Sequence, residues 1–254
     1  MCAVRPHRSR YWLTSRDKLE SPEAFTAQVQ QICDLYRDAP RLHAEGVHVV
    51  STDEKTGMQA IERLHPTKPT RPGLIERREF EYIRHGTLCL TANLEVATGR
   101  LIAPRLAEGR TNEDFVEHIE ATLASDPNAR WIFVVDNLDP HKSEAMVRTI
   151  ADKIGFSHDL GAMYKRGILK SRATRTTFLS DPAHRIRFVF TPRHCSWMNQ
   201  IEIWFSILAR RVLRRGSFRS TDDLRRKVRA FIRYFNAVFA KPFRWTYTGR
   251  PLQA

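Results

Sequence analysis

The apolar run from Trp131 to Val135 limits the possible folds more than any other segment of this chain. Its five consecutive apolar residues end at Asp136, which is the length of a strand and too short for a typical helix. A strand without polar alternation is buried on both faces, as in sheets that carry helices on both sides. The run therefore favours an α/β fold, a mixed sheet flanked by helices.

The rest of the chain supplies strands and helices for such a sheet. Two β-rich segments joined by Thr98-Gly99 predict an antiparallel meander, and Thr111 with Asp114 resembles a capping box at a helix start. The predicted strands are 47–52, 81–94, 100–106, 131–135 and 186–190, and the predicted helices are 22–39, 111–123, 143–154, 199–213 and 220–239. We expect residues 1–45 to form a peripheral linker and helix, and residues 46–254 to form one domain with a basic insertion at about 157–183.

The composition indicates a polyanionic partner. Lysine and arginine number 42 against 28 acidic residues, which gives a net charge of +14, and the hydrophobic content of 42% is sufficient for a folded core. No apolar run approaches the roughly 18–20 residues of a membrane span, and the N-terminus lacks the apolar segment of a secretory signal. We therefore expect a nucleic-acid partner rather than a membrane.

The cysteines indicate a reducing compartment. None of the four stands in a CxxC pair, and no histidine pair has zinc-finger spacing, so we expect neither a disulfide framework nor a structural zinc site. Free thiols are typical of a cytoplasmic protein. The four residues are Cys2, Cys33, Cys89 and Cys195.

Two arginine-rich stretches carry most of the excess charge. One lies within the predicted insertion, and the other follows the helix predicted from residue 199. Such clusters favour sequence-independent contacts with phosphates, although an ordinary solvated helix face is the alternative. The candidate DNA-binding residues are Lys165, Arg166, Lys170, Arg172, Arg175, Arg210, Arg211, Arg214 and Arg215.

Three acidic residues stand next to predicted elements of the sheet. Asp53 follows the strand 47–52, Asp136 follows 131–135, and Glu202 lies in the first turn of the helix after 186–190. If the strands are parallel neighbours, both aspartates emerge at the same end of the sheet, where ligands bind in such folds. Each acid alone is also compatible with a turn or a helix start. Together they predict a site for Mg²⁺, which prefers oxygen ligands.

The sequence around these acids resembles the three catalytic blocks of DDE transposases. The blocks are Ser51-Thr52-Asp53-Glu54-Lys55-Thr56, Val134-Val135-Asp136-Asn137 with His141-Lys142-Ser143, and Ser196 to Phe205. They are most similar to the bacterial insertion-sequence family numbered six-thirty, which is related to mariner elements. The resemblance covers residues 45–250 and implies an RNase H-like catalytic domain that cuts and pastes DNA. It also implies two Mg²⁺ or Mn²⁺ ions held by a catalytic triad of Asp53, Asp136 and Glu202.

Two departures from that family raise questions about this chain. Asp136 and Glu202 are 66 positions apart, which is longer than usual, and the extra length falls in the basic insertion, which we expect to contact DNA over the site. Only about 45 residues precede the first strand, whereas family members carry helix-turn-helix modules there. We therefore expect a split or truncated frame, or dependence on an upstream helix-turn-helix product. Asp139 is an additional acid that could perturb the site.

Taken with the charge, the resemblance predicts an insertion-sequence transposase. It would cleave double-stranded transposon ends in a metal-dependent reaction and transfer the strand to target DNA, acting as a dimer on DNA in the bacterial cytoplasm and nucleoid. The alternatives are a simpler RNase H-like nuclease and a truncated, catalytically impaired remnant that only binds DNA. Near Asp136, His141 either orients water or phosphate or starts a helix, and the Asn137 amide is an open candidate for supporting the metal.

Overall fold

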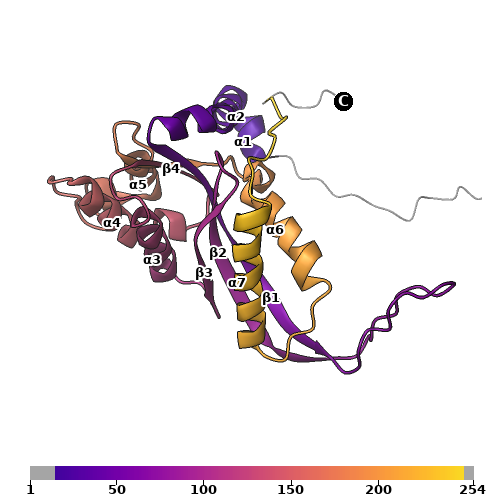
Figure 1. Cartoon of the computed structure of the whole chain (residues 1–254). Coiled ribbons are helices and arrows are strands. Elements are labelled where there is room, and N and C mark those ends of the chain that lie inside the picture. Colours follow the sequence, from indigo (N-terminus) through magenta and orange to yellow (C-terminus); the bar gives the residue numbers. More distant parts are fainter. Residues whose placement is uncertain (1–14, 249–254) are drawn as a thin grey trace, which may run out of the picture.

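A central sheet with five strands organises the molecule (Figure 1), and the computed structural model describes residues 15–248. The strand order is β3-β2-β1-β4-β5. β1 pairs antiparallel with β2 and parallel with β4, while β3 is antiparallel to β2 and β5 is parallel to β4. This confirms the predicted mixed sheet and meander. The strands are β1 (Val47–Arg63), β2 (Tyr82–Glu95), β3 (Leu101–Ala107), β4 (Arg130–Val135) and β5 (Ile186–Phe190).

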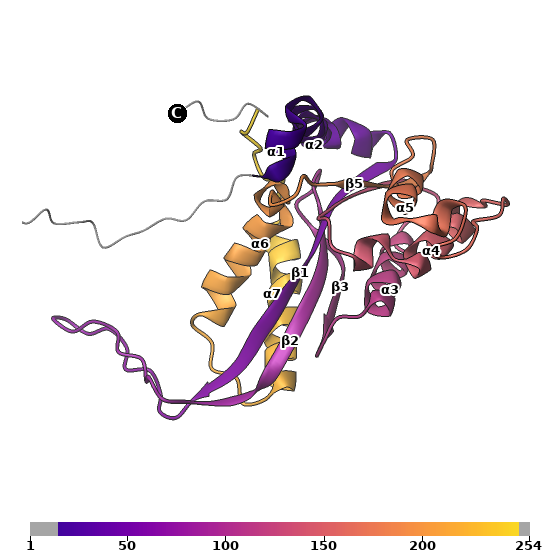
Figure 2. The ribbon, with the colours of Figure 1, turned by 180° about the vertical axis from the view of Figure 1, so that it is seen from behind.

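Helices cover both faces of this sheet (Figures 1 and 2). On one face α3, α4 and α5 pack on β4 and β5, and on the other α2 packs over β1, β4 and β5 while α6 and α7 pack over β1, β2 and β3. The helices are α1 (Arg16–Glu20), α2 (Pro22–Ala44), α3 (Asn112–Leu123), α4 (Glu144–Ile154), α5 (Arg172–Leu179), α6 (Ile201–Leu208) and α7 (Thr221–Val238), and a π-helical turn, η4 (Ala209–Leu213), continues α6. Within residues 15–248, no helix is both long and apolar enough to cross a membrane.

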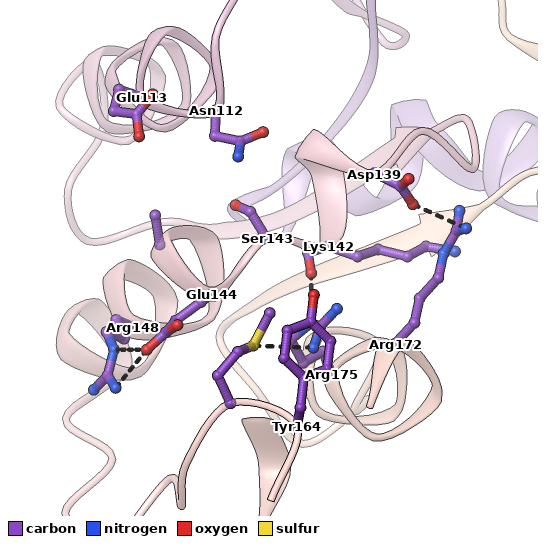
Figure 3. Close-up of a pocket in the computed structure, with 12 residues that line it drawn as sticks. Asn112, Glu113, Asp139, Lys142, Ser143, Glu144, Arg148, Tyr164, Arg172 and Arg175 are labelled. Carbon is purple, nitrogen blue, oxygen red and sulfur yellow. Dashed lines mark hydrogen bonds and ion pairs between the residues drawn. The ribbon is translucent and has the colours of Figure 1, made fainter. Parts of the chain in front are cut away.

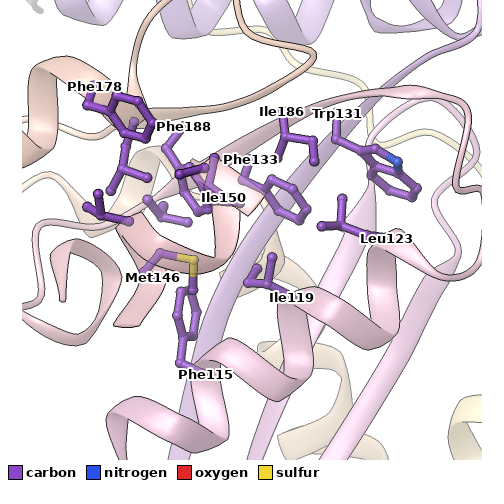
Figure 4. Packing of buried hydrophobic residues seen from close by; sticks show 14 of the residues in the cluster. Phe115, Ile119, Leu123, Trp131, Phe133, Met146, Ile150, Phe178, Ile186 and Phe188 are labelled. Carbon is purple, nitrogen blue, oxygen red and sulfur yellow. The ribbon is translucent and has the colours of Figure 1, made fainter. Parts of the chain in front are cut away.

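The apolar run that indicated the fold lies at the centre of the core. Figure 4 shows Trp131 and Phe133 of β4 packed with Ile186 and Phe188 of β5 and with side chains of α3 and α4. Phe133 stacks on Phe188 with ring centroids 5.2 Å apart. The opposite face of β4 is buried under α2, so the strand is covered on both sides as its composition predicts.

The first strand is longer than the sequence indicates. The prediction ended it at Thr52, but β1 continues through Asp53 to Arg63 by pairing with β2. The polar segment 53–57 resembles a loop because it has few apolar residues. It is kept in the sheet by the ladder with β2, and a register shift after Lys55 brings Met58 into the core. Asp53 is therefore a strand residue and not the residue that ends the strand.

Two segments that we expected at the periphery are part of the core. α2 buries Val29, Ile32 and Tyr36 against the sheet, because its apolar residues recur at helical spacing on one face. Within the predicted insertion 157–183, α5 buries Phe178 and Leu179 in the cluster around β4 and β5. Cys33, Cys89 and Cys195 are free and buried, as predicted, whereas Cys2 lies outside the described residues. The domain boundary at residue 45 stays a prediction.

Candidate active site

The strand register places Asp53 and Asp136 at the same level of the sheet. The parallel ladder between β1 and β4 ends at the pair Ser51 and Val134. Asp53 and Asp136 each lie two residues beyond that pair, on chains that run in the same direction. Asp53 is a residue of β1, Asp136 directly follows the end of β4 at Val135, and the negative charge of Asp136 contributes to raising the pKa of Asp53. The two aspartates therefore lie side by side where β1 and β4 separate.

A buried amide attaches the start of α6 to Asp53. Asn199 is fully buried and donates from Nδ2 to the main-chain carbonyl of Thr52 at 2.8 Å and to Asp53 Oδ2 at 3.3 Å. The Ser51 hydroxyl donates to Asn199 Oδ1 and accepts from the main-chain N–H of Ile201 at 2.9 Å. The first turn of α6 is thus fixed to β1 by hydrogen bonds on both sides of Asn199.

This attachment carries Glu202 to the aspartates. Glu202 is the second residue of α6, and its side chain is exposed while its neighbours Ile201 and Trp204 are buried. The charge of Glu202 contributes to raising the pKa of Asp53. The structure therefore brings the three acids predicted from the sequence into one electrostatic neighbourhood, drawn from β1, the end of β4 and α6.

Asp53 has the most perturbed environment of the three. Burial, together with the negative charges of Asp136, Glu54 and Glu202, raises its pKa to about 7, against a hydrogen bond from the Glu54 main-chain N–H that lowers it. Its side chain is only 6% exposed. An aspartate at this position stays ionised at neutral pH most readily when a cation balances the surrounding negative charge.

His141 links Asp136 to a fourth acid, Glu54. Its Nδ1 lies 2.9 Å from Asp136 Oδ1 and its Nε2 lies 3.4 Å from Glu54 Oε1. Burial disfavours the charged imidazole, but the two carboxylates outweigh burial and raise the pKa of His141 to about 9. Burial alone would raise the pKa of Asp136, and His141 holds it below its ordinary value. His141 lies in a short 3₁₀ turn (Pro140–Lys142), so it both starts the segment before α4 and orients Asp136.

Asn137 joins the ends of β4 and β5. Its Nδ2 donates to the Thr191 carbonyl, and its Oδ1 accepts from Lys142 Nζ. Lys142 also lies over the Phe190 ring, 4.1 Å from the centroid. Burial of Lys142 and the nearby charge of Arg172 lower its pKa to about 8. Both polar groups of the Asn137 amide form hydrogen bonds within the protein. Asn137 therefore has a structural role and is not a metal ligand.

The candidate DNA-binding residues differ in exposure. Arg175 is buried and donates from Nε to the Lys142 carbonyl at 2.7 Å, a structural contact that the sequence did not indicate. Arg175 lies on the buried side of α5, and the sequence did not show which side of the helix it is on. The other eight are exposed: Lys165, Arg166, Lys170, Arg172, Arg210, Arg211, Arg214 and Arg215.

The insertion contacts the segment that follows Asp136, through Arg172 with the Asn137 carbonyl and with Asp139. A pocket of about 820 Å³ is lined by residues of the insertion, α3 and α4, and none of the three acids lines it (Figure 3). Arg172 forms an ion pair of 2.9 Å with Asp139 at its rim. Asp139 is 83% exposed, so this additional acid turns toward Arg172 and the solvent.

Sequence reasoning missed two groups of residues. The sequence did not show that Glu54 pairs with His141 and Arg110, because contacts between distant segments cannot be read from local sequence. Sequence reasoning also missed a cluster of His43, His48 and Glu95 at the start of β1. The two histidines are five positions apart, and the glutamate comes from another strand.

A family model provides the decisive comparison for this geometry. The model described as DDE superfamily endonuclease matches residues 48–225, which include all three acids and most of the chain. The chain belongs to the DDE superfamily endonucleases. No curated protein matches it.

Solved structures show the same fold for this DDE endonuclease. The catalytic domain of Mos1 mariner transposase matches with 13% identity and a TM-score of 0.51, over 89% of this chain and 85% of that one. The Mos1 mariner paired end complex with Mn matches with 14% identity and a TM-score of 0.51, over 92% of this chain. The sheet is therefore RNase H-like, as the resemblance implied. The chain covers 60% of the Mos1 chain in that complex.

The donors of this DDE endonuclease site fit a hard divalent cation. Asp53, Asp136 and Glu202 offer only carboxylate oxygens, which Mg²⁺ and Mn²⁺ prefer. Burial and the neighbouring acids raise the pKa of Asp53, and a bound cation would stabilise its ionised form. Among the described residues, the three carboxylates do not gather within 4.8 Å of one another as a single-ion site would require. Carboxylates that lie further apart than a single ion allows are compatible with two ions about 3.5–4 Å apart.

The pKa of Asp53 predicts an unusual pH dependence of stability. The folded-state pKa of about 7 exceeds the ordinary 3.8, so the folded chain binds this proton more tightly than the unfolded chain. Ionisation of Asp53 therefore removes stability as the pH rises from about 4 to 7, by at most about 4 kcal/mol for three pKa units. With divalent metal chelated, we expect Asp53→Asn to be more stable than the wild type at pH 8 and to lose this advantage at pH 4.

Urea unfolding at several pH values measures this difference. Asp139→Asn is the matched control, because Asp139 is exposed, and we expect it to change the free energy of unfolding by less than about 0.5 kcal/mol. Parallel pH curves for the wild type and Asp53→Asn would contradict the assigned environment of Asp53.

Proposed function

We propose that this DDE endonuclease is the catalytic part of an insertion-sequence transposase of the family numbered six-thirty. The register of Asp53 with Asp136, with Glu202 fixed beside them through Asn199, is the observation that carries the proposal. The family match and the Mos1-like fold support it. Asp53, Asp136 and Glu202 are the proposed catalytic and metal-binding residues, for two Mg²⁺ or Mn²⁺ ions.

The proposed reaction breaks and forms phosphodiester bonds in double-stranded DNA. In cleavage, a water oxygen bonds to phosphorus while the bond from phosphorus to the 3′-oxygen breaks, and a proton from the water passes to the leaving 3′-oxygen, which gives a 5′-phosphate and a 3′-hydroxyl. In strand transfer, the freed 3′-hydroxyl oxygen bonds to a target phosphorus, and a target oxygen leaves with the proton. The metal ions, when bound, activate the attacking oxygen and stabilise the leaving oxygen. The chain itself holds the carboxylates in place, through Asn199 for Asp53 and through His141 for Asp136.

The retained acids favour an active enzyme over a DNA-binding remnant. A remnant has no need to keep Asp53 buried among three other acids, because that burial costs stability when no cation is bound. A simpler RNase H-like nuclease would share this site. The two enzymes differ in their products, since only a transposase joins a specific DNA end to a target.

We expect each triad substitution to abolish metal-dependent DNA cleavage. Asp53→Asn, Asp136→Asn and Glu202→Gln should each lower the cleavage rate at least 100-fold, because each removes a charged ligand while keeping the side-chain shape. The assay incubates a supercoiled plasmid that carries the element's ends with Mn²⁺ and follows nicking and joining. Asp139→Asn should retain the wild-type rate. Equal rates in the wild type and the triad variants would refute the site, and nicking without end-specific joining would favour the simpler nuclease.

The exposed basic residues are proposed contacts with DNA phosphates. Arg214 and Arg215 follow the π-helical turn η4 with exposed side chains, and neither forms an ion pair among the described residues. Unpaired guanidinium groups bind phosphates and release counterions, which makes the affinity dependent on salt. This DNA contact would also place the protein at the nucleoid.

The salt dependence of DNA binding tests these contacts. We expect the double substitution of Arg214 and Arg215 by alanine to reduce the slope of log K against log salt by about 2, for duplexes of any sequence. The matched control replaces Arg37 and Arg41 of α2, which are exposed but paired with acids of the same helix. A slope that falls equally in both double variants, or in neither, would argue against a specific role for Arg214 and Arg215.

A projecting hairpin supports the proposed dimer on DNA. The segment between β1 and β2 extends away from the body of the molecule (Figures 1 and 2). It is held by antiparallel bridges such as Lys68 with Arg77. Along it Leu74, Ile75 and Phe80 are 53%, 80% and 84% exposed. Apolar side chains on a projecting arm favour contact with a partner surface, and we propose a second copy of this chain.

Substitutions in the arm test this dimer. In analytical ultracentrifugation with DNA ends, we expect the wild type to form a complex of two chains on two paired ends. We expect Leu74→Asp with Ile75→Asp to form only complexes of one chain on one unpaired end. Thr67→Asp with Thr70→Asp introduces the same charge on the same arm and should preserve the two-chain complex. Two chains in the complex of the Leu74 and Ile75 variant would show that the arm is not the contact.

A further inference from the structure

Three side chains from three elements converge at the start of β1, on the N-terminal side of Asp53. His43 lies at the C-terminal end of α2, His48 is the second residue of β1, and Glu95 ends β2. One nitrogen of each histidine and a carboxylate oxygen lie within 4.8 Å of one another. Figure 2 shows α2 leading into β1 at this end of the sheet. His48 and Asp53 are five positions apart along β1, so at about 3.3 Å per residue their main chains are roughly 16 Å apart.

The distances between these atoms are close to those of a metal-ligand set. His43 Nδ1 lies 3.2 Å and His48 Nδ1 lies 2.5 Å from the same oxygen, Glu95 Oε1. Around a tetrahedral ion with bonds of about 2.1 Å, ligand atoms are about 3.4 Å apart. Moving His48 and Glu95 apart by about 1 Å would therefore admit an ion between the three atoms.

An unpaired nitrogen faces this cluster. His43 Nδ1 is buried and has no hydrogen-bond partner within residues 15–248, although Glu95 is 3.2 Å away. A buried polar atom without a hydrogen bond costs stability, and such an atom calls for an explanation. A lone pair of His43 Nδ1 directed at a metal ion would supply one.

Outer contacts hold the other two side chains in a ligating orientation. His48 Nε2 lies 3.3 Å from Asp126 Oδ2, and a proton held there would leave Nδ1, which now contacts Glu95 Oε1, to coordinate an ion. The His48 ring also stacks on Trp131 with centroids 4.2 Å apart. Thr98 Oγ1 donates to Glu95 Oε2 at 3.1 Å, which leaves Oε1 toward the histidines. A carboxylate behind a metal-bound histidine is a common feature of zinc sites.

We propose that His43, His48 and Glu95 bind one Zn²⁺ ion. Two imidazoles and one carboxylate suit Zn²⁺, whereas a site for Mg²⁺ is built from oxygens alone. The ion would join the end of α2 to β1 and β2, and the partial exposure of His43 leaves the fourth position to water. Such a site differs from the cysteine-based zinc sites that the sequence excludes, and it does not depend on the proposed transposase activity.

Calorimetric titration with ZnCl₂ tests the proposal. The background is the full chain with Asp53→Asn and Asp136→Asn, so that Zn²⁺ cannot report on the DDE acids. We expect one equivalent of Zn²⁺ bound by this background and loss of that equivalent on adding His43→Ala or Glu95→Gln. Asp126→Asn should keep the stoichiometry but weaken the affinity about 10–100-fold, because Asp126 orients His48 without ligating. Zn²⁺ at 100 times its Kd should raise Tm by about 5 °C.

Controls separate metal binding from folding. His65→Ala removes another exposed histidine outside the cluster and should bind Zn²⁺ as the background does. Circular dichroism without metal shows whether each variant is folded, and His43 is exposed enough for its substitution to be tolerated. No Zn²⁺ bound by the background, or equal binding in the folded His43→Ala and His65→Ala variants, would overturn the proposal. The cluster would then be a histidine–carboxylate hydrogen-bond network only.

Discussion

The end of the parallel ladder between β1 and β4 is the constraint on which the rest of the site depends. Up to Ser51 the central strand has partners on both edges, and beyond it β1 continues only with β2. Asp53 therefore stays in a rigid strand while one of its edges is free for other groups. Ser51, the last residue of β1 that pairs with β4, also accepts a hydrogen bond from the first turn of α6. A single break in the sheet thus positions side chains from β1, β4 and α6.

The same break explains how four acids are tolerated at one site, where the side chains of Asp53 and Glu54 are buried. Asp53 faces Asn199 and Glu202 on one side, while Glu54, as the next strand residue, faces His141 and Arg110 on the other. Among the described residues, Arg110 and His141 pair with Glu54 and His141 also pairs with Asp136, whereas Asp53 forms no ion pair. Burial, with the charges of the neighbouring acids, raises the pKa of Asp53, while His141 outweighs the effect of burial and lowers the pKa of Asp136. The protein leaves one side of the site for an external cation.

Local signals made most elements predictable from the sequence. The capping residues Thr111 and Ser143 begin α3 and α4 where expected, and the apolar runs at 131–135 and 186–190 are strands. The sequence was less informative where non-local pairing overrides composition. The polar continuation of β1 is held by β2, and Arg175 is buried because α5 turns it toward main-chain carbonyls of distant residues. The acids were found because each has a motif, whereas Glu54 and His141 meet only through the sheet.

Two positions along β1, its start near His48 and its interior near Asp53, offer different chemistry to metal ions. Near Asp53 the available ligands are oxygens, which are hard donors and accept Mg²⁺ or Mn²⁺ with retained water. Near His48 two of the three ligands are imidazole nitrogens, which favour Zn²⁺ over Mg²⁺. Selectivity then follows from ligand type rather than from shape, so one strand can serve both sites. An ion at the His48 end would tighten α2 on the sheet, and α2 also holds the segment before α6 through Tyr36, whose hydroxyl donates to the Met198 carbonyl at 2.9 Å. The two positions along the strand are therefore connected through α2.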